Sequence, residues 1–393
     1  MEEWKEYKLG DICKSNIYSY SEKDNWAFVN YLDTGNITEN KISDIQFIDL
    51  SSESLPSRAR RKVQINDIIY STVRPNQKHF GIIKNQPENF LVSTGFAVLH
   101  INKTIADPNF VFYNLIQNEN TETLHAIAEQ TTSAYPAIKP SDIENLSIKV
   151  PPLPTQQKIA DILSSLDDKI ELNTKINTNL EQQARALFKN WFVDFAPFGG
   201  KMPEEWKVGK LSDIADYLNG LAMQKFRPLE DEEGLPVLKI KELRQGCYDE
   251  ISELCSPSKV KPEYIIHDGD VIFSWSGSLL VDIWCGGTCG LNQHLFKVTS
   301  QTYEKWFYYL WTKHHLDRFI FLAADKATTM GHIKREELDK AEVVIPDDKT
   351  YQNLTSVIKP FIDEIINNRI ENRKLSQIRD GLLPKLMNGE IVV

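Results

Sequence analysis

The feature that most constrains this chain is a long internal repeat. The string EEWKEYKLGDI at 2–12 returns as EEWKVGKLSDI at 204–214, with eight of eleven positions identical. Two further pairs of strings match at nearly the same offset: NDIIYS (66–71) with GDVIFS (269–274), and IKPSDIENLSIKVP (138–151) with IKREELDKAEVVIP (333–346). Each copy is about 195 residues, far longer than the 20–45 residues of a solenoid unit. The repeat therefore predicts a duplicated domain, with each copy followed by a duplicated helix.

The pattern divides the chain into four predicted segments: globular domains at 1–152 and 201–345, and helical segments at 153–200 and 346–393. The globular parts carry short β-rich runs, such as DIIYSTV and DVIFSWS, bounded by Asn, Asp, Gly and Pro. Aromatic-rich stretches at 110–117 and 306–320 predict one helix each, packed on a sheet. The expected class is α+β, with two similar mixed α/β domains.

Residues 155–195 contain almost no Gly or Pro, and apolar side chains recur there every seven residues, as in a coiled coil. The same two rows recur in the second helix. Both helices place asparagine at equivalent seam positions, where it fixes the register of a coiled coil at a cost in stability. These asparagines are Asn173, Asn177, Asn368 and Asn372. Pro360 is expected to kink or start the second helix, and Pro384 to end it near Gly381.

The matched seams predict that the two helices pair antiparallel around a pseudo-twofold axis. A helix of about 38 residues spans roughly 57 Å. Such a pair would hold the two similar domains apart, like a ruler for a target with repeated half-sites such as duplex DNA. The alternative is two ordinary amphipathic helices, each packed only on its own domain.

Composition excludes several other classes of protein. The net charge is −10, from 45 basic and 55 acidic residues, so DNA affinity would have to come from local patches or from a partner. No apolar run approaches the roughly 18 residues of a membrane span, and the charged N-terminus lacks the apolar core of a signal peptide. The five cysteines are sparse and odd in number, as expected for reduced thiols in a cytoplasmic protein.

Several strings resemble the specificity subunit of Type I restriction-modification systems. LFKNWFVDFAPFGG (187–200) is similar to the central conserved region of that family, and RDGLLPKLMNGEIVV (379–393) to its C-terminal end. DIIYSTVRPN (67–76) and STGFAVLHI (93–101) resemble strand motifs of its target recognition domains. Together with the order of domains and helices, the resemblance covers essentially the whole chain.

The resemblance implies a non-catalytic, DNA-recognising subunit. Each target recognition domain would read one half of a bipartite site in double-stranded DNA, and the helices would set the spacer and recruit two methylation subunits. Those partners, not this chain, would bind S-adenosylmethionine, and restriction or translocase subunits could join them. No cofactor and no metal is expected in the chain itself. A variant of this interpretation is a specificity subunit that serves a methylation or phage-defence system without classical restriction.

Two other classes compete with this interpretation. One is a coiled-coil scaffold whose paired domains bind protein. The other is an enzyme in its own right, for which the sequence offers little: no [DN]-P-P-[YF] motif holds a target amine, and no G-x-x-x-x-G-K-[ST] loop occurs. The trio Asp33, Glu39 and Lys41 could suggest a nuclease, but such a trio arises easily by chance.

In the first domain, candidate DNA contacts gather around two strands. Arg58, Arg60, Arg61 and Lys62 place four cations within five positions, which suits phosphate neutralisation or guanine readout. Arg74, Asn76, Lys78 and His79 follow the strand DIIYSTV and supply donors and acceptors. Tyr135 lies in a loop expected to face the DNA. The alternative for these residues is a solvated loop or ordinary turn chemistry.

The second domain offers weaker candidates at corresponding places, with the same alternative. Amides such as that of Gln293 could read base edges, adenine in particular. The candidate residues are Lys225, Arg227, Lys259, Lys261, Ser274, Trp275, Gln293, His294, Thr329 and His332.

Overall fold

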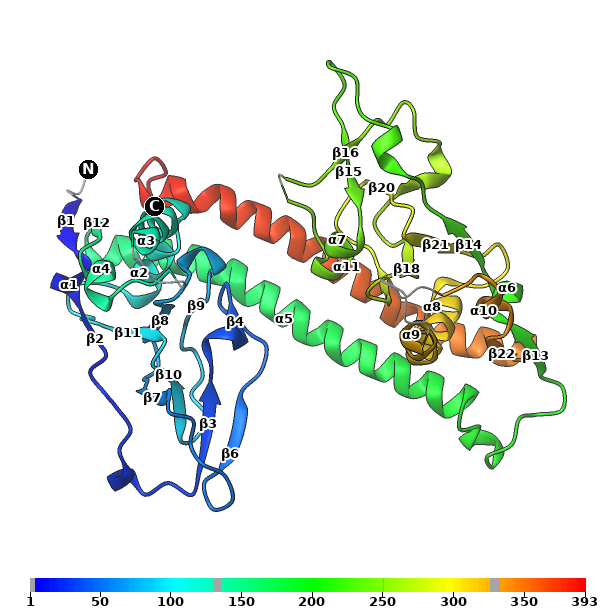
Figure 1. Ribbon diagram of the computed structural model, residues 1–393, viewed down its shortest axis with the longest axis horizontal. Coiled ribbons are helices and arrows are strands. Elements are labelled where there is room, and N and C mark those ends of the chain that lie inside the picture. The colour runs from blue at the N-terminus through cyan, green and yellow to red at the C-terminus, as the bar shows by residue number, and fades with distance from the viewer. Residues whose placement is uncertain (1–3, 131–135, 250, 326–332) are drawn as a thin grey trace. The chain divides into compact units, whose positions relative to one another are not determined.

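The computed structural model describes residues 4–130, 136–249, 251–325 and 333–393 (Figure 1). These residues form two compact units. Unit 1 comprises Met1–Asp168 and Ser376–Val393, and unit 2 comprises Lys169–Leu375. Each unit therefore contains one globular part and a portion of each of the two long helices.

Unit 1 contains two four-stranded sheets. The first has the order β2 (Cys13–Ser15), β11 (Phe96–Ile101), β8 (Ile68–Ser71), β9 (Phe80–Ile82), and every pair in it is antiparallel. The second has the order β6 (Gln46–Asp49), β3 (Phe28–Leu32), β10 (Phe90–Ser93), β7 (Ala59–Lys62), with β10 parallel to β3. Two small pairs complete the unit: β1 (Lys5–Lys8) with β12 (Ser147–Val150), and β4 (Ile37–Thr38) with β5 (Lys41–Ile42).

The two sheets of unit 1 bury an apolar layer between them. Leu32 and Val92 from one sheet meet Ile69 and Val98 from the other, and all four are buried. The far side of the first sheet carries the larger core, which is covered by short helices and by the ends of the long ones. The short helices are α1 (Leu9–Ile12), α2 (Pro108–Leu115), α3 (Asn118–Glu129) and α4 (Pro140–Glu144). Asp107 caps α2 by accepting hydrogen bonds from the N–H groups of Asn109 and Phe110, and Pro108 takes the first position, where no N–H is needed.

Unit 2 repeats the strand order of both four-stranded sheets, but its described residues contain no counterpart of the β4–β5 pair. Its sheets have the orders β14 (Asp216–Asn219), β21 (Leu295–Thr299), β18 (Val271–Ser274), β19 (Leu280–Ile283) and β16 (Leu254–Cys255), β15 (Leu235–Leu238), β20 (Cys289–Leu291), β17 (Ile265–Ile266). As in unit 1, the third strand of the second sheet is parallel to the second. The pair β13 (Lys207–Lys210) with β22 (Glu342–Ile345) matches β1 with β12. The predicted duplication is confirmed.

The helices of unit 2 differ from the prediction in one place. They are α6 (Leu211–Ile214), α7 (Ile240–Gln245), α8 (Lys305–His314), α9 (Leu316–Asp325) and α10 (Glu336–Asp339). The single helix predicted at 306–320 is wrong, because the chain breaks at His315 into α8 and α9. The ring Nε2 of His315 donates to the carbonyl of Glu342 at 2.7 Å, which holds this corner against the start of β22.

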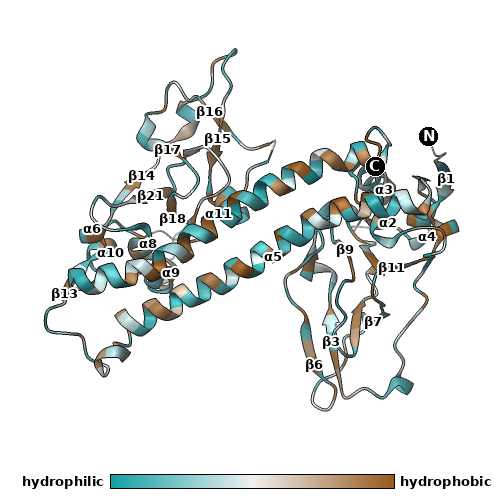
Figure 2. Ribbon diagram, turned by 180° about the vertical axis from the view of Figure 1, so that it is seen from behind, coloured by the Kyte–Doolittle hydropathy of each residue, from teal (hydrophilic) through white to brown (hydrophobic). Residues whose placement is uncertain are grey.

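The long helices are α5 (Leu153–Phe192) and α11 (Asp348–Met387), and each contributes to both units. In unit 2 they pair antiparallel, since Asn173 contacts Asn372 and Asn177 contacts Asn368. In unit 1 they pair in the same sense through Asp167 and Arg379. Figure 2 shows both helices banded in apolar and polar residues, as the heptad pattern predicted. The antiparallel coiled coil is confirmed.

The expectation that proline would shape the second helix is wrong in part. α11 runs without interruption through Pro360 and Pro384, so neither starts nor ends it. Each proline removes one backbone hydrogen bond. The buried side chains of Ile358 and Ile362 on either side of Pro360 keep the helix on its core, while Pro360 itself is exposed. No helix in the described ranges is both long and apolar enough to cross a membrane.

Candidate nucleic-acid interface

A tight turn joins β10 to β11 in unit 1 and consists of Ser93, Thr94 and Gly95. The N–H of Gly95 donates to the Ser93 hydroxyl at 3.3 Å. Its carbonyl accepts from the N–H of Thr72, the residue that follows β8, at 2.8 Å. Thr94 is exposed at the tip, and its N–H donates to the carbonyl of Arg58 at 2.8 Å. The turn is thus bonded to two neighbouring strands and presents one short polar side chain.

The turn between β20 and β21 in unit 2 repeats two of these bonds. The N–H of His294 donates to the side-chain oxygen of Asn292 at 3.1 Å. The carbonyl of His294 accepts from the N–H of Trp275, which follows β18, at 3.4 Å. Gln293 occupies the tip and is half-buried.

The shared bonds establish which residues of the two turns are equivalent. The buried hydroxyls of Ser71 and Ser274 strengthen the match, because each donates to the carbonyl two residues ahead, at 2.9 and 3.3 Å. The equivalent positions, unit 1 before unit 2, are Thr72 and Trp275, Val73 and Ser276, Ser93 and Asn292, Thr94 and Gln293, and Gly95 and His294. The backbone frame is common, and the side chains that it presents differ.

Side chains around the unit 2 turn form a hydrogen-bonded cluster. The hydroxyl of Ser276 lies 2.9 Å from His294 Nδ1, and the amide nitrogen of Gln293 lies 3.3 Å from His294 Nε2. The indole N–H of Trp275 donates to Asn219 at 3.0 Å, and its ring lies 6.3 Å from the imidazole. The structure therefore brings together three predicted residues, Trp275, Gln293 and His294. The fourth, Ser274, is buried and bonded to backbone.

The unit 1 turn is surrounded by charge instead. Burial alone would raise the pKa of Asp33, but the N–H of Thr34 and the hydroxyl of Tyr31 outweigh it and lower that pKa. Ser93 and the positive charge of Arg58 act in the same direction. An ionised Asp33 and the Arg58 guanidinium thus accompany the turn. Asp33 accepts hydrogen bonds from Tyr31 and Thr34, and Glu39 pairs with Lys78.

The predicted basic run Arg58–Lys62 lies mostly on β7, at one edge of its sheet, and its four cations have different surroundings. Lys62 pairs with Asp24 at 2.5 Å and lies 5.2 Å from the ring of Trp26. Arg60 donates to the carbonyl of its neighbour Ala59 at 2.9 Å. Arg61 is half-buried, and burial lowers the pKa of its guanidinium. Of the four, Arg58 is the exposed cation beside the turn.

The predicted residues after β8 form a second loop, η3 (Pro75–Gln77) and its flanks. Asn76 is exposed and Arg74 half-buried, whereas Lys78 pairs with Glu39 at 3.1 Å. His79 Nδ1 donates to the carbonyl of Ile37 at 2.6 Å. His79 therefore fastens the β4–β5 hairpin.

The remaining unit 2 cations take no part in the hydrogen bonds described above for the turn's cluster, and Lys225 ends the short 3-10 helix η5 (Met223–Lys225). Arg227 pairs with Glu253 at 2.9 Å, and Lys259 donates to the carbonyl of Arg227 at 3.0 Å. Lys225 and Lys261 are exposed. Three predicted residues, Tyr135, Thr329 and His332, lie outside the described residues.

Comparison with known proteins decides the family. The sequence profile described as "Type I restriction modification DNA specificity domain" matches residues 1–182 and 203–378. This chain belongs to the family of Type I restriction-modification specificity subunits. It is 30% identical to the Type I restriction enzyme HindI specificity subunit of Haemophilus influenzae, with all of both chains covered. It is 28% identical to the MjaIX specificity subunit of Methanocaldococcus jannaschii, over 98% of this chain and 92% of that one.

A solved structure has the same fold. The crystal structure of the Type I restriction-modification system S subunit from M. genitalium aligns with 98% of this chain and 96% of its own, with a TM-score of 0.58 and 15% identity. As a specificity subunit, the chain is the non-catalytic component of a Type I restriction-modification complex. Within the described ranges, no group of three His, Cys, Asp or Glu residues could hold a metal ion.

The long helices of this specificity subunit are joined by polar contacts in both units. In unit 2, the buried side-chain amide of Asn173 donates to Glu371 at 2.6 Å and to Asn372 at 2.9 Å, and Asn368 donates to Asn177 at 3.0 Å. The four predicted register residues thus contact one another in two pairs. Because Asn368 and Asn177 are the repeat counterparts of Asn173 and Asn372, the pairs exchange under the internal repeat.

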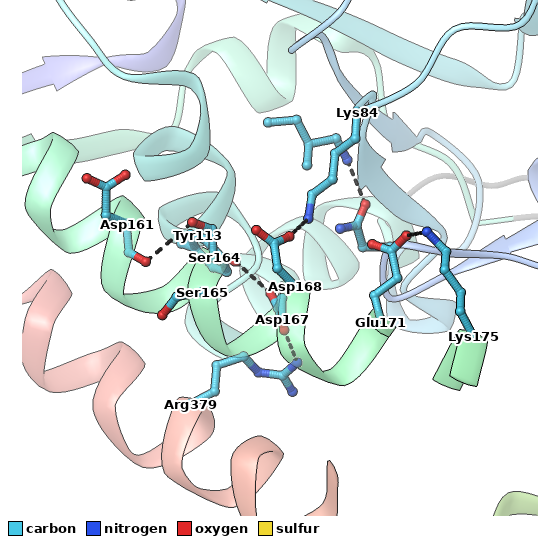
Figure 3. Close-up of polar contacts among 12 residues, drawn as sticks. Lys84, Tyr113, Asp161, Ser164, Ser165, Asp167, Asp168, Glu171, Lys175 and Arg379 are labelled. Carbon is cyan, nitrogen blue, oxygen red and sulfur yellow. Dashed lines mark hydrogen bonds and ion pairs between the residues drawn. The ribbon is translucent and has the colours of Figure 1, made fainter. Parts of the chain in front are cut away.

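In unit 1, the coiled coil carries an ion pair in its seam instead (Figure 3). Arg379 of α11 contacts Asp167 of α5 at 2.7 Å, and the hydroxyl of Tyr113 donates to the same carboxylate at 2.6 Å. Lys84 pairs with the adjacent Asp168 at 2.5 Å. Arg379 follows Asn372 by seven residues and so falls in the same heptad row, but the sequence does not identify its partner, which lies 212 residues earlier in the chain.

Sequence reasoning also missed residues of the two turns. Thr94 and Asn219 were not singled out, although they lie at or beside the tips. For Thr94 a signal existed. Aligning STGF at 93–96 with NQHL at 292–295, which the repeat permits, makes Thr94 the counterpart of Gln293.

Proposed function

We propose that this specificity subunit reads a bipartite sequence in double-stranded DNA, one half-site with each recognition domain. In this proposal the recognition domains are residues 1–152 and 201–345, and residues 153–200 and 346–393 form the conserved helical segments. The observation that carries the proposal is the pair of equivalent turns, which share a backbone frame and present different side chains. A protein that recognises two different half-sites with duplicated domains needs the same backbone frame in both domains and different side chains at the equivalent positions.

The proposed partners follow from the family. Two methylation subunits would dock on the conserved helices, bind S-adenosylmethionine and modify adenine, and restriction or translocase subunits would join them. The chain itself would supply DNA contacts and spacing, at work on DNA in the cytoplasm. The net charge of −10 fits this division, because the partners would provide most of the positive surface around the duplex.

The first test is genome-wide sequencing of adenine methylation in the source cell, with and without this gene. We expect one split motif with a fixed spacer to lose methylation when the gene is deleted, and to regain it on complementation. If every motif stays methylated in a strain that expresses the methylation partner, the proposal fails and a protein-binding scaffold becomes the better explanation. Deleting the restriction gene as well separates a restricting system from one that only methylates.

The spacing role has its own test. Removing one heptad from both α5 and α11 shortens the paired helices by about 10 Å, which corresponds to roughly three base pairs. The preferred spacer should shorten accordingly, while both half-sites stay the same. A spacer of unchanged length would contradict the proposed spacing role of the helices.

A further inference from the structure

We propose that Gln293, at the tip of the β20–β21 turn, reads an adenine in the second half-site, and that His294 and Ser276 position its carboxamide. This inference rests on the proposed function and assigns one base contact within it. Among the polar side chains of unit 2, Gln293 is the one proposed to contact a base.

The position of Gln293 favours it over its neighbours. It lies at the tip of a turn whose other two residues are held from behind: Asn292 is buried, and its side chain accepts from the backbone of His294. Gly220 packs directly against the backbone of this turn. A Cβ added at Gly220 would lie 2.2 Å from the Asn292 carbonyl oxygen, so only glycine fits there. The side chain of Asn292 is thus bonded to the backbone and that of His294 to the Ser276 hydroxyl, while Gln293 is the half-buried side chain at the tip.

The chemistry of Gln293 suits adenine. A carboxamide offers one acceptor oxygen and two N–H donors. Adenine presents an acceptor, N7, and a donor, the N6 amino group, side by side in the major groove, and Gln or Asn matches that pair with two hydrogen bonds. Guanine presents two acceptors there, which a carboxamide cannot satisfy in the same way.

The surrounding cluster explains how the carboxamide is held. Gln293 donates one N–H to His294 Nε2 at 3.3 Å, which leaves its second N–H and its oxygen for a base. That contact requires a neutral imidazole with its proton on Nδ1, where the Ser276 hydroxyl lies at 2.9 Å. Trp275 bonds to Asn219 at 3.0 Å and lies beside the imidazole. Preorganised contacts of this kind lose less conformational entropy on binding.

Unit 1 provides the contrast that makes the inference specific. The equivalent of Gln293 is Thr94, which has one hydroxyl, and the equivalents of His294 and Ser276 are Gly95 and Val73. At these described positions unit 1 has no side chain that could hold an amide as His294 and Ser276 do. Its turn is accompanied by the charged Arg58, whose carbonyl accepts from Thr94. Amide readout from this turn is expected in only one of the two half-sites.

The test is the Gln293→Ala variant in the full complex with its methylation partners, with the methylated motif read genome-wide. One A·T pair in one half-site should become degenerate. In competition binding with matched oligonucleotides, discrimination at that pair should fall roughly 5- to 150-fold, the range expected for one bidentate base contact. The other half-site and the spacer should not change.

Three further variants sharpen the result. Gln301→Ala, at an exposed glutamine of the same unit, should leave the motif intact. Gln293→Glu keeps the size of the side chain and removes its N–H donors, so adenine preference should fall even if the alanine variant folds poorly. Ser276→Ala should relax the same base pair by a smaller factor, without changing the other positions. Relaxation of all positions together would indicate a structural role instead.

The outcomes that overturn the inference differ from those that overturn the proposed function. If the wild-type chain directs a split motif and Gln293→Ala and Gln293→Glu both leave it unchanged, Gln293 is not the reader. If the relaxed pair is G·C, the adenine assignment is wrong. A gene deletion that changes no motif would instead remove the proposed function itself.

Discussion

In unit 1, the turn between β10 and β11 presents Thr94 and Gly95, whereas in unit 2 the equivalent turn presents Gln293 and His294. Two of the bonds that hold the turns are the same in both units, and they join backbone atoms with one another and with the side chain of Ser93 or Asn292. The two units therefore separate the task of holding a turn from the task of presenting side chains. Under the proposed function, substitutions at the tips change which bases are recognised, while the strands beneath the turns keep their structure.

The two units also differ in how they hold α11. Unit 2 uses two arginines of that helix: Arg369 contacts Asp282 at 2.9 Å, and Arg373 makes two bonds of 2.7 Å to Asp268. Unit 1 uses Arg379 with Asp167. Different stretches of α11 are thus held by different ion pairs, to the globular part in unit 2 and to α5 in unit 1, which allows each attachment to be broken separately.

The largest expected effect comes from the backbone beneath the turns. In Gly220→Ala, the new Cβ would lie within 2.6 Å of three backbone atoms of Leu291 and Asn292, so the backbone must move. We expect unit 2 to lose about 3 kcal/mol of unfolding free energy. Gly95→Ala in unit 1 is the matched control, because its Cβ meets the rotatable methyl of Thr34 at 2.8 Å and should cost about 1 kcal/mol. Chemical denaturation measures both, and equal losses would contradict the comparison.

The second-largest effect is expected from breaking the ion pairs that hold α11 in each unit. Asp268→Ala leaves the half-buried guanidinium of Arg373 with fewer acceptors and should destabilise unit 2 by about 2 kcal/mol. Asp167→Ala should destabilise unit 1 by a similar amount. Hydrogen exchange should report each loss mainly in its own unit. Glu171→Ala removes an exposed pair on α5 and serves as control, with about 0.5 kcal/mol or less.

A smaller effect is expected from the cations around the turns. Reversing Arg58 and Arg60 to glutamate should weaken DNA binding about 10-fold and reduce the salt dependence by roughly two phosphate contacts. Reversing Lys259 and Lys261 should have a weaker effect, about 3-fold, since Lys259 is bonded to the carbonyl of Arg227. Titrating the complex with DNA at several salt concentrations measures both. A protein-binding scaffold would respond to neither pair.

The smallest expected effect is a dependence on pH. The bond to Arg373 lowers the pKa of Asp268 below its ordinary value of 3.8, so ionised Asp268 stabilises the folded state. That contribution is fully present above pH 4 and is lost as the pH falls through the lowered pKa. Between pH 5 and pH 3 the change should be roughly 1 kcal/mol or less. Asp268→Asn should flatten this part of the pH profile of unit 2, and an unchanged profile would exclude Asp268 as its source.

The sequence predicted the parts of the fold that depend on repetition. The duplicated domains, the heptad seams and the asparagine layers are visible because each is written twice at a nearly constant offset. It failed where a local rule was outweighed by packing. Pro360 and Pro384 lie inside α11 because buried side chains hold the helix together, and the helix predicted at 306–320 breaks at His315.

The candidate interface was harder to predict because it depends on long-range contacts. Lys62 belongs to a basic run by sequence, but Asp24 neutralises it from 38 residues away. His79 and Ser274 look like exposed polar residues, yet each is bonded to backbone. The sequence does not place Trp275 beside His294; the pairing of β18 with β21 brings the two together.

The division of the long helices between the units has a consequence for synthesis on the ribosome. Unit 2 is a single continuous segment, Lys169–Leu375, whereas unit 1 includes Ser376–Val393, and Leu386 and Met387 lie in its largest core. At 5–20 residues per second, the roughly 200 residues between the two parts of unit 1 take about 10–40 s to emerge. During that interval unit 1 lacks Leu386 and Met387, so part of its apolar core stays uncovered and a chaperone could bind it. Unit 2 is made later but can complete its core before unit 1 does.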